Sequence, residues 1–360
     1  MIRDKAQILD EIHQSPTLLS LFNSWEERYQ QEFLDFCTGV RGIKLLYDSF
    51  FKAIFDPDVA PERLERLLSL ILKTEVKILK VLPNESTRIA AESSLLVLDI
   101  VIQLADGSIA NVEVQKIGYA FPGQRSACYS ADLLLRQYKR VKGEKGKLFS
   151  YKDIKKVYTI VLFEKSTPEF HQFQYIYLHR IKPQSDTGIQ IELLQEYVFI
   201  ALDIFRKKLD NEGNNITNEL EAWLAFLSID DPDVILKLIE AYPQFEPLYR
   251  EVYEMCLNLE RMMEMFSKEL AELDKNTVQY MIDEMQDTID AQNVTINEQN
   301  TTIDEQKILL NKKDDMIRGQ RIHLDQKDQE LQNLKKEIEA LKKQLESDDS
   351  SPDLKEKGQY

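Results

Sequence analysis

Residues 94–140 read SLLVLDIVIQLADGSIANVEVQKIGYAFPGQRSACYSADLLLRQYKR, and this stretch decides the fold. Its first part, residues 95–104, is rich in Val, Ile and Leu and predicts a strand that one aspartate, Asp99, interrupts. Residues 105–108 (ADGS) have turn chemistry, and residues 109–115 form a second β-prone run. The stretch therefore predicts a β-hairpin, followed by a helix.

Polar side chains lie inside this predicted hairpin. Glu113 and Gln115 are two residues apart, so they lie on one face of the second strand. A charge within an apolar strand is costly unless it is paired or binds a cation. Two carboxylates on neighbouring strands, Asp99 and Glu113, therefore predict a shared site for a hard cation.

The register of the hairpin decides whether that site can form. A two-residue turn or a four-residue loop sets Asp99 opposite Val114, so that Asp99 and Glu113 project from opposite faces. A three-residue loop or a β-bulge brings both carboxylates to one face. We expect a three-residue loop of residues 106–108, which sets Asp99 opposite Gln115, with a bulge as the alternative.

Four short segments occur in order along the chain: DSFFK at 48–52, LDI at 98–100, VEVQ at 112–115, and Arg125 with Tyr129. Their order and spacing resemble the PD-(D/E)XK nuclease superfamily and, more narrowly, its transposase family of recombination-promoting, Rpn-type nucleases. The resemblance runs from about residue 48 to residue 138. It implies an α/β fold with a restriction-endonuclease-like PD-(D/E)XK core and flanking helices.

The resemblance also implies a set of site residues. Asp99, Glu113 and the main-chain carbonyl of Val114 would hold Mg²⁺, or another divalent cation such as Mn²⁺. Many members have Lys where this chain has Gln115, an amide that can orient water and donate to a phosphate but cannot act as a base. Asp48 matches the acidic residue that the preceding helix supplies in the family. Its alternative interpretation is a surface aspartate near the middle of a helix over residues 43–55.

Residues 122–141 predict a helix with two different stripes. We expect one stripe to pack on the sheet: Ala127, Ala131, Leu134, Tyr138 and Val141. The other stripe consists of Arg125, Tyr129, Asp132, Arg136 and Lys139. In the family interpretation Arg125 and Tyr129 clamp a phosphodiester, with Arg136 and Lys139 as further DNA contacts. Alternatively Tyr129 only packs, and Arg125 pairs with Asp132.

Charge is unevenly distributed along the chain. The net charge of −16 over 360 residues argues at first against nucleic acid. Residues 116–156, however, carry eleven Lys or Arg and three Asp or Glu. This basic segment beside the predicted site is compatible with phosphate binding, or is a solvated helix and loop.

Cysteines and histidines show no zinc-ligand spacing, so zinc is not expected. Neither a signal peptide nor a membrane span is apparent, so we expect a cytoplasmic protein with no membrane partner.

The character of the sequence changes near residue 281. Ten aliphatic residues recur at heptad spacing: Ile282, Ile289, Ile296, Ile303, Leu310, Ile317, Leu324, Leu331, Ile338 and Leu345. Such a repeat is typical of a coiled coil and predicts a homo-oligomer. The second seam is mostly Gln and Lys between residues 292 and 327, which predicts a weak middle.

These patterns divide the chain into five parts. We expect an N-terminal helical extension (1–42), a nuclease-like domain (43–210), a helical region (219–280), a coiled coil (281–346) and a disordered tail (347–360). The predicted function is Mg²⁺-dependent DNA endonuclease activity, hydrolysing phosphodiester bonds in connection with recombination or mobile elements. The alternative is a catalytically weak or inactive nuclease fold that binds DNA or protein and oligomerises through the coil. A third class is a structural coiled-coil protein in which Asp99 is an ordinary paired strand charge.

Overall fold

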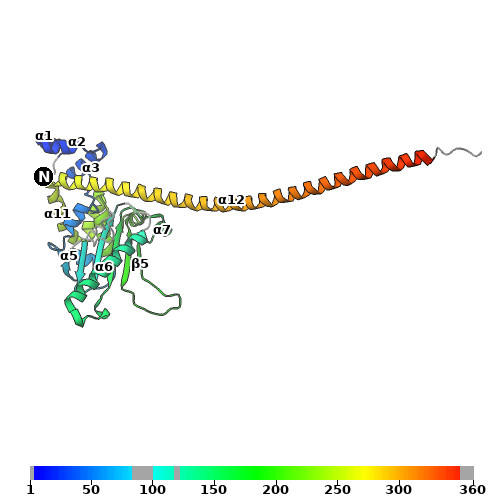
Figure 1. Ribbon diagram of the computed structural model, residues 1–360. Coiled ribbons are helices and arrows are strands. Elements are labelled where there is room, and N and C mark those ends of the chain that lie inside the picture. The colour runs from blue at the N-terminus through cyan, green and yellow to red at the C-terminus, as the bar shows by residue number, and fades with distance from the viewer. Residues whose placement is uncertain (1–3, 83–99, 117–121, 349–360) are drawn as a thin grey trace, which may run out of the picture. The chain divides into compact units, whose positions relative to one another are not determined.

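The computed structural model describes residues 4–82, 100–116 and 122–348. The chain divides into two compact units, Met1–Glu284 and Met285–Tyr360 (Figure 1). The first unit contains a mixed β-sheet and most of the helices. The boundary falls inside one long helix, α12 (Leu259–Asp348).

A six-stranded sheet in the order β1-β2-β3-β4-β6-β5 forms the centre of the first unit. The central strands β3, β4 and β6 are parallel, and the remaining pairs are antiparallel. Helix α6 (Pro122–Lys145) follows β3 and precedes β4, as the crossover between two parallel strands requires. The strands are β1 (Ile78–Val81), β2 (Ile100–Leu104), β3 (Ile109–Gln115), β4 (Val157–Phe163), β5 (Leu178–Ile181) and β6 (Gln195–Ala201).

Helices precede and follow the sheet in sequence. Those before it are α1 (Lys5–Gln14), α2 (Pro16–Asn23), α3 (Glu27–Thr38), α4 (Asp48–Ile54) and α5 (Pro61–Leu72). Those after α6 and before α12 are α7 (Pro168–His171), α8 (Leu202–Asn211), α9 (Glu219–Ser228), α10 (Pro232–Ala241) and α11 (Glu246–Leu257), with short 3₁₀ turns η1 (Gly146–Leu148), η2 (Tyr151–Asp153) and η3 (Pro243–Phe245). Several begin as sequence predicts: Pro61 opens α5, and Asp231 caps α10 ahead of Pro232.

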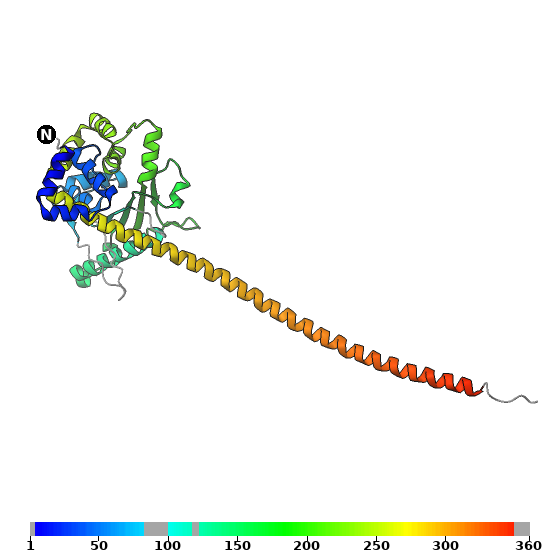
Figure 2. The ribbon, with the colours of Figure 1, turned by 90° about the horizontal axis from the view of Figure 1, so that it is seen from above.

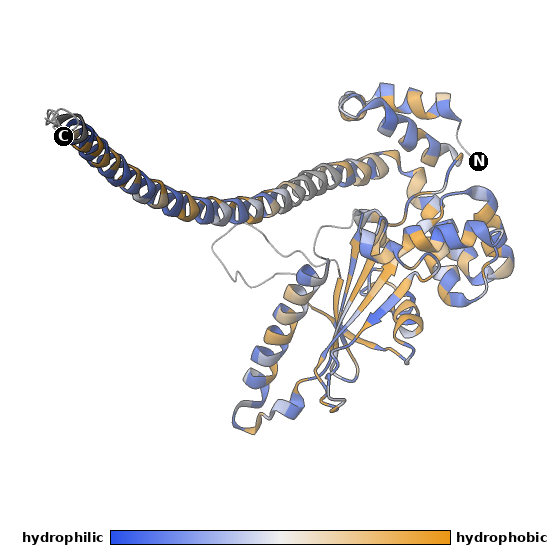
Figure 3. Cartoon of the chain, turned by 90° about the vertical axis from the view of Figure 1, so that its right-hand side faces the viewer, coloured by the Kyte–Doolittle hydropathy of each residue, from blue (hydrophilic) through white to orange (hydrophobic). Residues whose placement is uncertain are grey.

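The two faces of the sheet have different partners. One face contributes Ile102, Val112 and Leu162 to the main hydrophobic core. Helices α1–α5, α8–α11 and the start of α12, together called the helical layer, complete this core. The opposite face meets α6 through a small cluster that includes Val101, Ile109 and Tyr129. Figure 3 shows α6 on one side of the sheet and the helical layer on the other.

The start of α12 belongs to the core of the first unit. Phe266 is fully buried, and its ring lies 5.1 Å from that of Trp25, 5.6 Å from that of Phe33 and 6.1 Å from that of Phe36. Helix α3 and the turn between α2 and α3 therefore pack on the first turns of α12, and Figure 2 shows the blue N-terminal helices beside the yellow start of α12. The domain boundaries proposed at residues 42, 210 and 280 stay predictions.

The hairpin closes one residue earlier than expected. Ile100 pairs with Val112 and Ile102 with Ala110. The N–H of Leu104 donates to the carbonyl of Ser108 at 2.8 Å, so the three-residue loop is 105–107 and not 106–108. The Asp106 carboxylate accepts from both the N–H and the hydroxyl of Ser108 at 2.9 Å, which draws Ser108 into the strand.

Glycine is needed at one position of this loop. Gly107 has φ +88°, a conformation that side chains disfavour, and an added Cβ there would meet Lys155 Cγ at 3.2 Å. The loop has the predicted length of three residues, although it starts one residue earlier than predicted. Asp99 and the start of the predicted strand 95–104 lie outside the described residues.

The second unit consists of the distal part of α12. The eight described heptad aliphatics between Ile289 and Ile338 are 46–61% exposed in the single chain. A continuous apolar stripe thus runs along this helix, as the sequence predicts. None of the helices in the described part of the chain combines the length and the apolar character needed to cross a membrane.

Candidate active site

Glu113 and Gln115 lie side by side on β3, between β2 and β4. Both side chains are 5% exposed, and Gln115 Nε2 donates to Glu113 Oε1 at 2.7 Å. Alternation along β3 places them on the same face as Ile109, which packs against Tyr129 and Leu133 of α6. The pair is therefore enclosed between the sheet and α6.

Burial dominates the electrostatics of Glu113. Removal from water raises the pKa of the Glu113 carboxyl to about 7, against a smaller lowering by the Gln115 hydrogen bond and by the charge of Arg125. Near neutral pH the carboxyl is therefore poised between its two protonation states. Perturbed carboxyls of this kind gather at functional sites.

The donor atoms of this pair suit a divalent cation. Glu113 Oε2 and Gln115 Oε1 are buried and have no hydrogen-bond partner among the described residues. Carboxylate and amide oxygens are the ligands that Mg²⁺ and Mn²⁺ prefer. Within residues 4–82, 100–116 and 122–348, no three or more His, Cys, Asp or Glu side chains group closely enough to hold a metal ion. The second predicted carboxylate, Asp99, lies outside those ranges.

Two further predicted site residues have defined backbone positions. Asp48 is the first residue of α4, not a residue near the middle of a longer helix, because the residues before it form a turn that ends at the N-cap Tyr47. Val114 lies within β3 and pairs with Leu162 of β4. Its main-chain carbonyl is adjacent in sequence to the Glu113 and Gln115 side chains.

Arg125 lies in the first turn of α6, close to the carboxylate. Arg125 Nη2 donates to the hydroxyl of Tyr129 at 2.9 Å, and its charge acts on Glu113. Tyr129 is 2% exposed, so its ring packs against the sheet and its hydroxyl positions the guanidinium. Asp132 pairs with Arg136, Nε to Oδ2, at 2.7 Å. Lys139, the last of the four predicted DNA contacts, is exposed.

The expected packing stripe of α6 is wrong at its first two positions, whereas Leu134 packs against the cluster of Val101, Ile109 and Tyr129 as expected. Ala127 and Ala131 are exposed, whereas Ser126, Ser130 and Gln137 are buried against the sheet. The covered sheet surface explains the difference, because it is itself polar. Ser130 Oγ accepts from Gln195 Nε2 at 3.0 Å, and Gln137 Oε1 accepts from a main-chain N–H at 2.6 Å.

Lys116 follows Gln115 but points to the opposite face. Its ammonium lies 3.8 Å from the centre of the Tyr47 ring and forms an ion pair with Glu269 of α12. The side chains of Lys116 and Glu269 are 9% and 2% exposed. The sequence analysis did not predict this pair. The one local sign is Glu269 itself, a charged residue that follows the buried Phe266 and precedes the buried Leu270 in α12.

The polar cluster around His171 lacks the geometry of a catalytic triad. His171 Nε2 contacts Ser166 Oγ at 3.1 Å and Asp203 Oδ2 at 3.0 Å. Both partners meet the same ring nitrogen, so His171 cannot relay a proton between them as a triad does.

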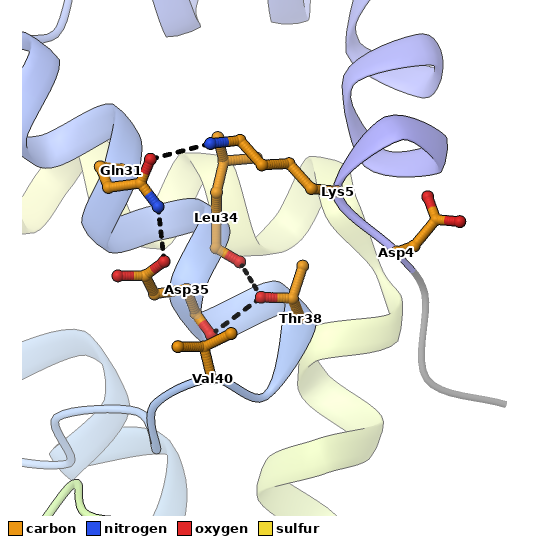
Figure 4. A pocket seen from close by; sticks show the side chains of 7 residues that line it. All are labelled: Asp4, Lys5, Gln31, Leu34, Asp35, Thr38 and Val40. Carbon is orange, nitrogen blue, oxygen red and sulfur yellow. Dashed lines mark hydrogen bonds between the residues drawn. The ribbon is translucent and has the colours of Figure 1, made fainter.

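A hollow of about 460 Å³ lies between α1 and α3 (Figure 4). Its polar groups pair with one another: Lys5 Nζ donates to Gln31 Oε1 at 2.8 Å, and Gln31 Nε2 donates to Asp35 Oδ1 at 2.6 Å. The lining residues are Asp4, Lys5, Gln31, Leu34, Asp35, Thr38 and Val40. None of them belongs to β3 or α6, so this hollow is separate from the Glu113 site.

Comparison with known families gives one match. A family described as PD-(D/E)XK nuclease family transposase matches residues 45–283. The matched span includes the whole sheet and α6, and it ends beside the boundary between the two compact units. Comparisons with curated proteins and with solved structures found no match.

Proposed function

The chain belongs to the PD-(D/E)XK nuclease family of transposases, and on this premise we propose that it is a divalent-cation-dependent DNA endonuclease acting in recombination of mobile DNA. The observation that carries the proposal is the buried pair of Glu113 and Gln115, beside the guanidinium of Arg125. Two oxygens of this pair have no hydrogen-bond partner in the described part of the chain. A buried carboxylate of this kind is costly in a purely structural role. It is useful when a cation completes it.

We assign Asp99 as the second carboxylate. The register of β2 on β3 supports this assignment, because Ile100 pairs with Val112. The same register continued by one residue pairs position 99 with Glu113, and directly opposite residues share a face. Asp99, Glu113 and the Val114 carbonyl would then hold Mg²⁺ or Mn²⁺, with Asp48 at the start of α4 as an outer acidic residue.

The protein's own side chains have distinct roles in this proposal. Glu113 holds the cation once it is ionised. Gln115 fixes one carboxylate oxygen of Glu113 and offers its carbonyl to orient the attacking water. Arg125, held by the Tyr129 hydroxyl, faces the incoming phosphate and offsets its negative charge. A cation held by these residues would stabilise charge on the phosphate and lower the pKa of its bound water.

Homo-oligomerisation through α12 is the second part of the proposal. The exposed aliphatic stripe repeats every seven residues, and a second copy of the same helix is its natural complement. Association would place several nuclease units on one DNA molecule, as the joining of two DNA ends in recombination requires.

Nicking of supercoiled plasmid DNA tests the catalytic part. We expect the wild type to nick in Mg²⁺ or Mn²⁺ and not in EDTA, and Glu113→Gln to lose nicking. Glu144→Gln is the matched control, because Glu144 is an exposed glutamate of α6. Nicking by Glu113→Gln at the wild-type rate would exclude this site. A wild type that binds DNA but does not nick with either cation would favour the binding-module alternative.

A further inference from the structure

An exposed aromatic cluster lies at the end of α6 away from the helical layer. Tyr138 and Tyr151 stack with ring centres 6.1 Å apart and an interplanar angle of 15°. Phe149 packs edge-on against both rings, at 5.5 Å from each centre. Tyr151 is 76% exposed, so one broad ring face remains open to solvent.

The turn that carries this cluster is well organised. Ser150 caps η2, and its N–H donates to Asp153 Oδ2 at 2.8 Å. Asp153 also pairs with Lys145 at the end of α6. These contacts tie η2 to α6 and hold Tyr151 in place without covering it. An exposed ring that is held rigidly loses little conformational entropy when it binds.

Positive charge surrounds the rings. Residues 136–156 carry nine Lys or Arg and two Asp or Glu, in a chain of net charge −16. Two of the nine pair with carboxylates outside this segment, Arg136 with Asp132 and Lys156 with Glu192 and Glu196. Lys142 Nζ donates to the Tyr138 hydroxyl at 2.8 Å and lies 5.2 Å from the centre of that ring. In the described part of the chain, Lys147 and Lys152 have no acidic partner within ion-pair distance. An open aromatic face among cations fits a negatively charged partner with flat rings.

We propose that Tyr151, stacked on Tyr138 and flanked by Lys147 and Lys152, binds an unpaired base of single-stranded DNA. Bases of any sequence stack on aromatic side chains while lysines contact the backbone, a combination typical of single-strand binding. A duplex hides its base faces and offers nothing for the Tyr151 ring. The inference rests on the proposed action on DNA and adds that the substrate contains single-stranded nucleotides.

The cluster is a second contact, apart from the Glu113 site. Tyr138 follows Arg125 by thirteen residues, which corresponds to about 20 Å along α6 and to a different flank of that helix. About 20 Å of duplex spans roughly six base pairs. Substrates that join a duplex to a single strand therefore reach both contacts.

Fluorescence anisotropy with labelled oligo(dT) and a labelled duplex of equal length tests the proposal. The full-length protein is titrated in EDTA, so binding is measured without cleavage and independently of the nicking assay. We expect tighter binding of oligo(dT), and about tenfold weaker binding by Tyr151→Ala with an unchanged salt slope. Lys147→Ala combined with Lys152→Ala is expected to weaken binding and flatten the salt slope.

Tyr175→Ala is the matched control for ring removal, because Tyr175 is 62% exposed and lies before β5. Equal binding of oligo(dT) by the wild type and Tyr151→Ala would overturn the proposal. So would a preference for duplex or no binding of either DNA. Loss of self-association in Tyr151→Ala, measured by sedimentation, would instead assign the cluster to a contact between copies.

Discussion

Lys116 and Glu269 form an ion pair in the interior of the protein, although 153 residues separate them in sequence. Lys116 directly follows the Glu113–Gln115 pair on the central strand, and Glu269 belongs to the helix that leads to the exposed apolar stripe. The pair therefore links the C-terminal end of β3 to the N-terminal part of α12.

Breaking this ion pair from one side is expected to be costly. Lys116→Met leaves the Glu269 carboxylate buried without its cation, and we expect the free energy of unfolding to fall by about 3 kcal/mol. The double variant Lys116→Met/Glu269→Leu is expected to recover most of that loss, because both charges are removed. Urea unfolding measures both values.

Lys268→Met provides the control for this comparison. Lys268 precedes Glu269 but is exposed and pairs at the surface with Glu264, so its loss is expected to leave the free energy of unfolding almost unchanged. Equal effects of Lys116→Met and Lys268→Met would show that the buried pair contributes nothing special.

The pKa of Glu113 predicts a pH-dependent stability for the metal-free protein. Its carboxyl has a pKa of about 7 in the folded state and 4.5 as an ordinary glutamate. The folded state therefore binds the proton more tightly, and this contribution is complete below about pH 4.5 and lost as the pH rises through 7. The loss amounts to about 3 kcal/mol at most.

Glu113→Gln isolates this effect, since the amide has the same shape and does not titrate. In EDTA, we expect wild-type stability to fall relative to the variant between about pH 5 and pH 8. Parallel curves for the two proteins across that interval would contradict the raised pKa. Adding Mg²⁺ at the higher pH is expected to stabilise the wild type alone.

Arg136 and Lys139 are expected to respond differently to charge reversal, although both are predicted DNA contacts. Arg136 pairs with the buried Asp132, so Arg136→Glu is expected to lower the free energy of unfolding by about 3 kcal/mol. Lys139 is exposed, so Lys139→Glu is expected to leave stability unchanged, weaken DNA binding and flatten the salt slope. Denaturation and DNA titrations separate the two effects, and a Lys139→Glu protein with normal affinity at low salt would remove Lys139 from the interface.

Oligomerisation through the apolar stripe can be tested with isoleucines of one helix. Ile303→Asn combined with Ile317→Asn places two polar side chains in the stripe, and we expect a lower mass in light scattering. Ile308→Asn combined with Ile322→Asn is the matched control. Ile308 and Ile322 are 57% and 60% exposed, against 46% and 58% for Ile303 and Ile317, but they lie five positions later, on the opposite side of α12. The same mass for both double variants would exclude the stripe as the association surface.

Sequence reasoning succeeded where one strong local pattern decided the structure. Helix α5 follows from sequence features alone, because Pro61 opens it and its apolar positions form one buried stripe. The hairpin forms with the predicted three-residue loop length, although the loop is 105–107 and not 106–108. The family resemblance proved correct over most of the chain.

The wrong or missing predictions have one physical cause. A local sequence pattern does not show which residues the folded chain brings against it. Apolar periodicity in α6 favoured Ala127 and Ala131, but the sheet presents polar groups there, so Ser130 and Gln137 face inward. The loop boundary depended on how the Asp106 side chain bonds to Ser108. The ion pair of Lys116 was invisible for the same reason, since only the folded chain brings its partner near.

The strict seven-residue period of α12 makes its length adjustable. The segments IDAQNVT, INEQNTT and IDEQKIL begin at Ile289, Ile296 and Ile303, and all three have Ile first and Gln fourth; the first two agree at four of seven positions. Inserting or deleting one such unit changes the helix by about 10 Å and leaves the stripe in line, whereas a single inserted residue turns everything beyond it by about 100°. Whole-unit duplication or loss can therefore tune the reach of this arm in evolution while the nuclease fold stays untouched.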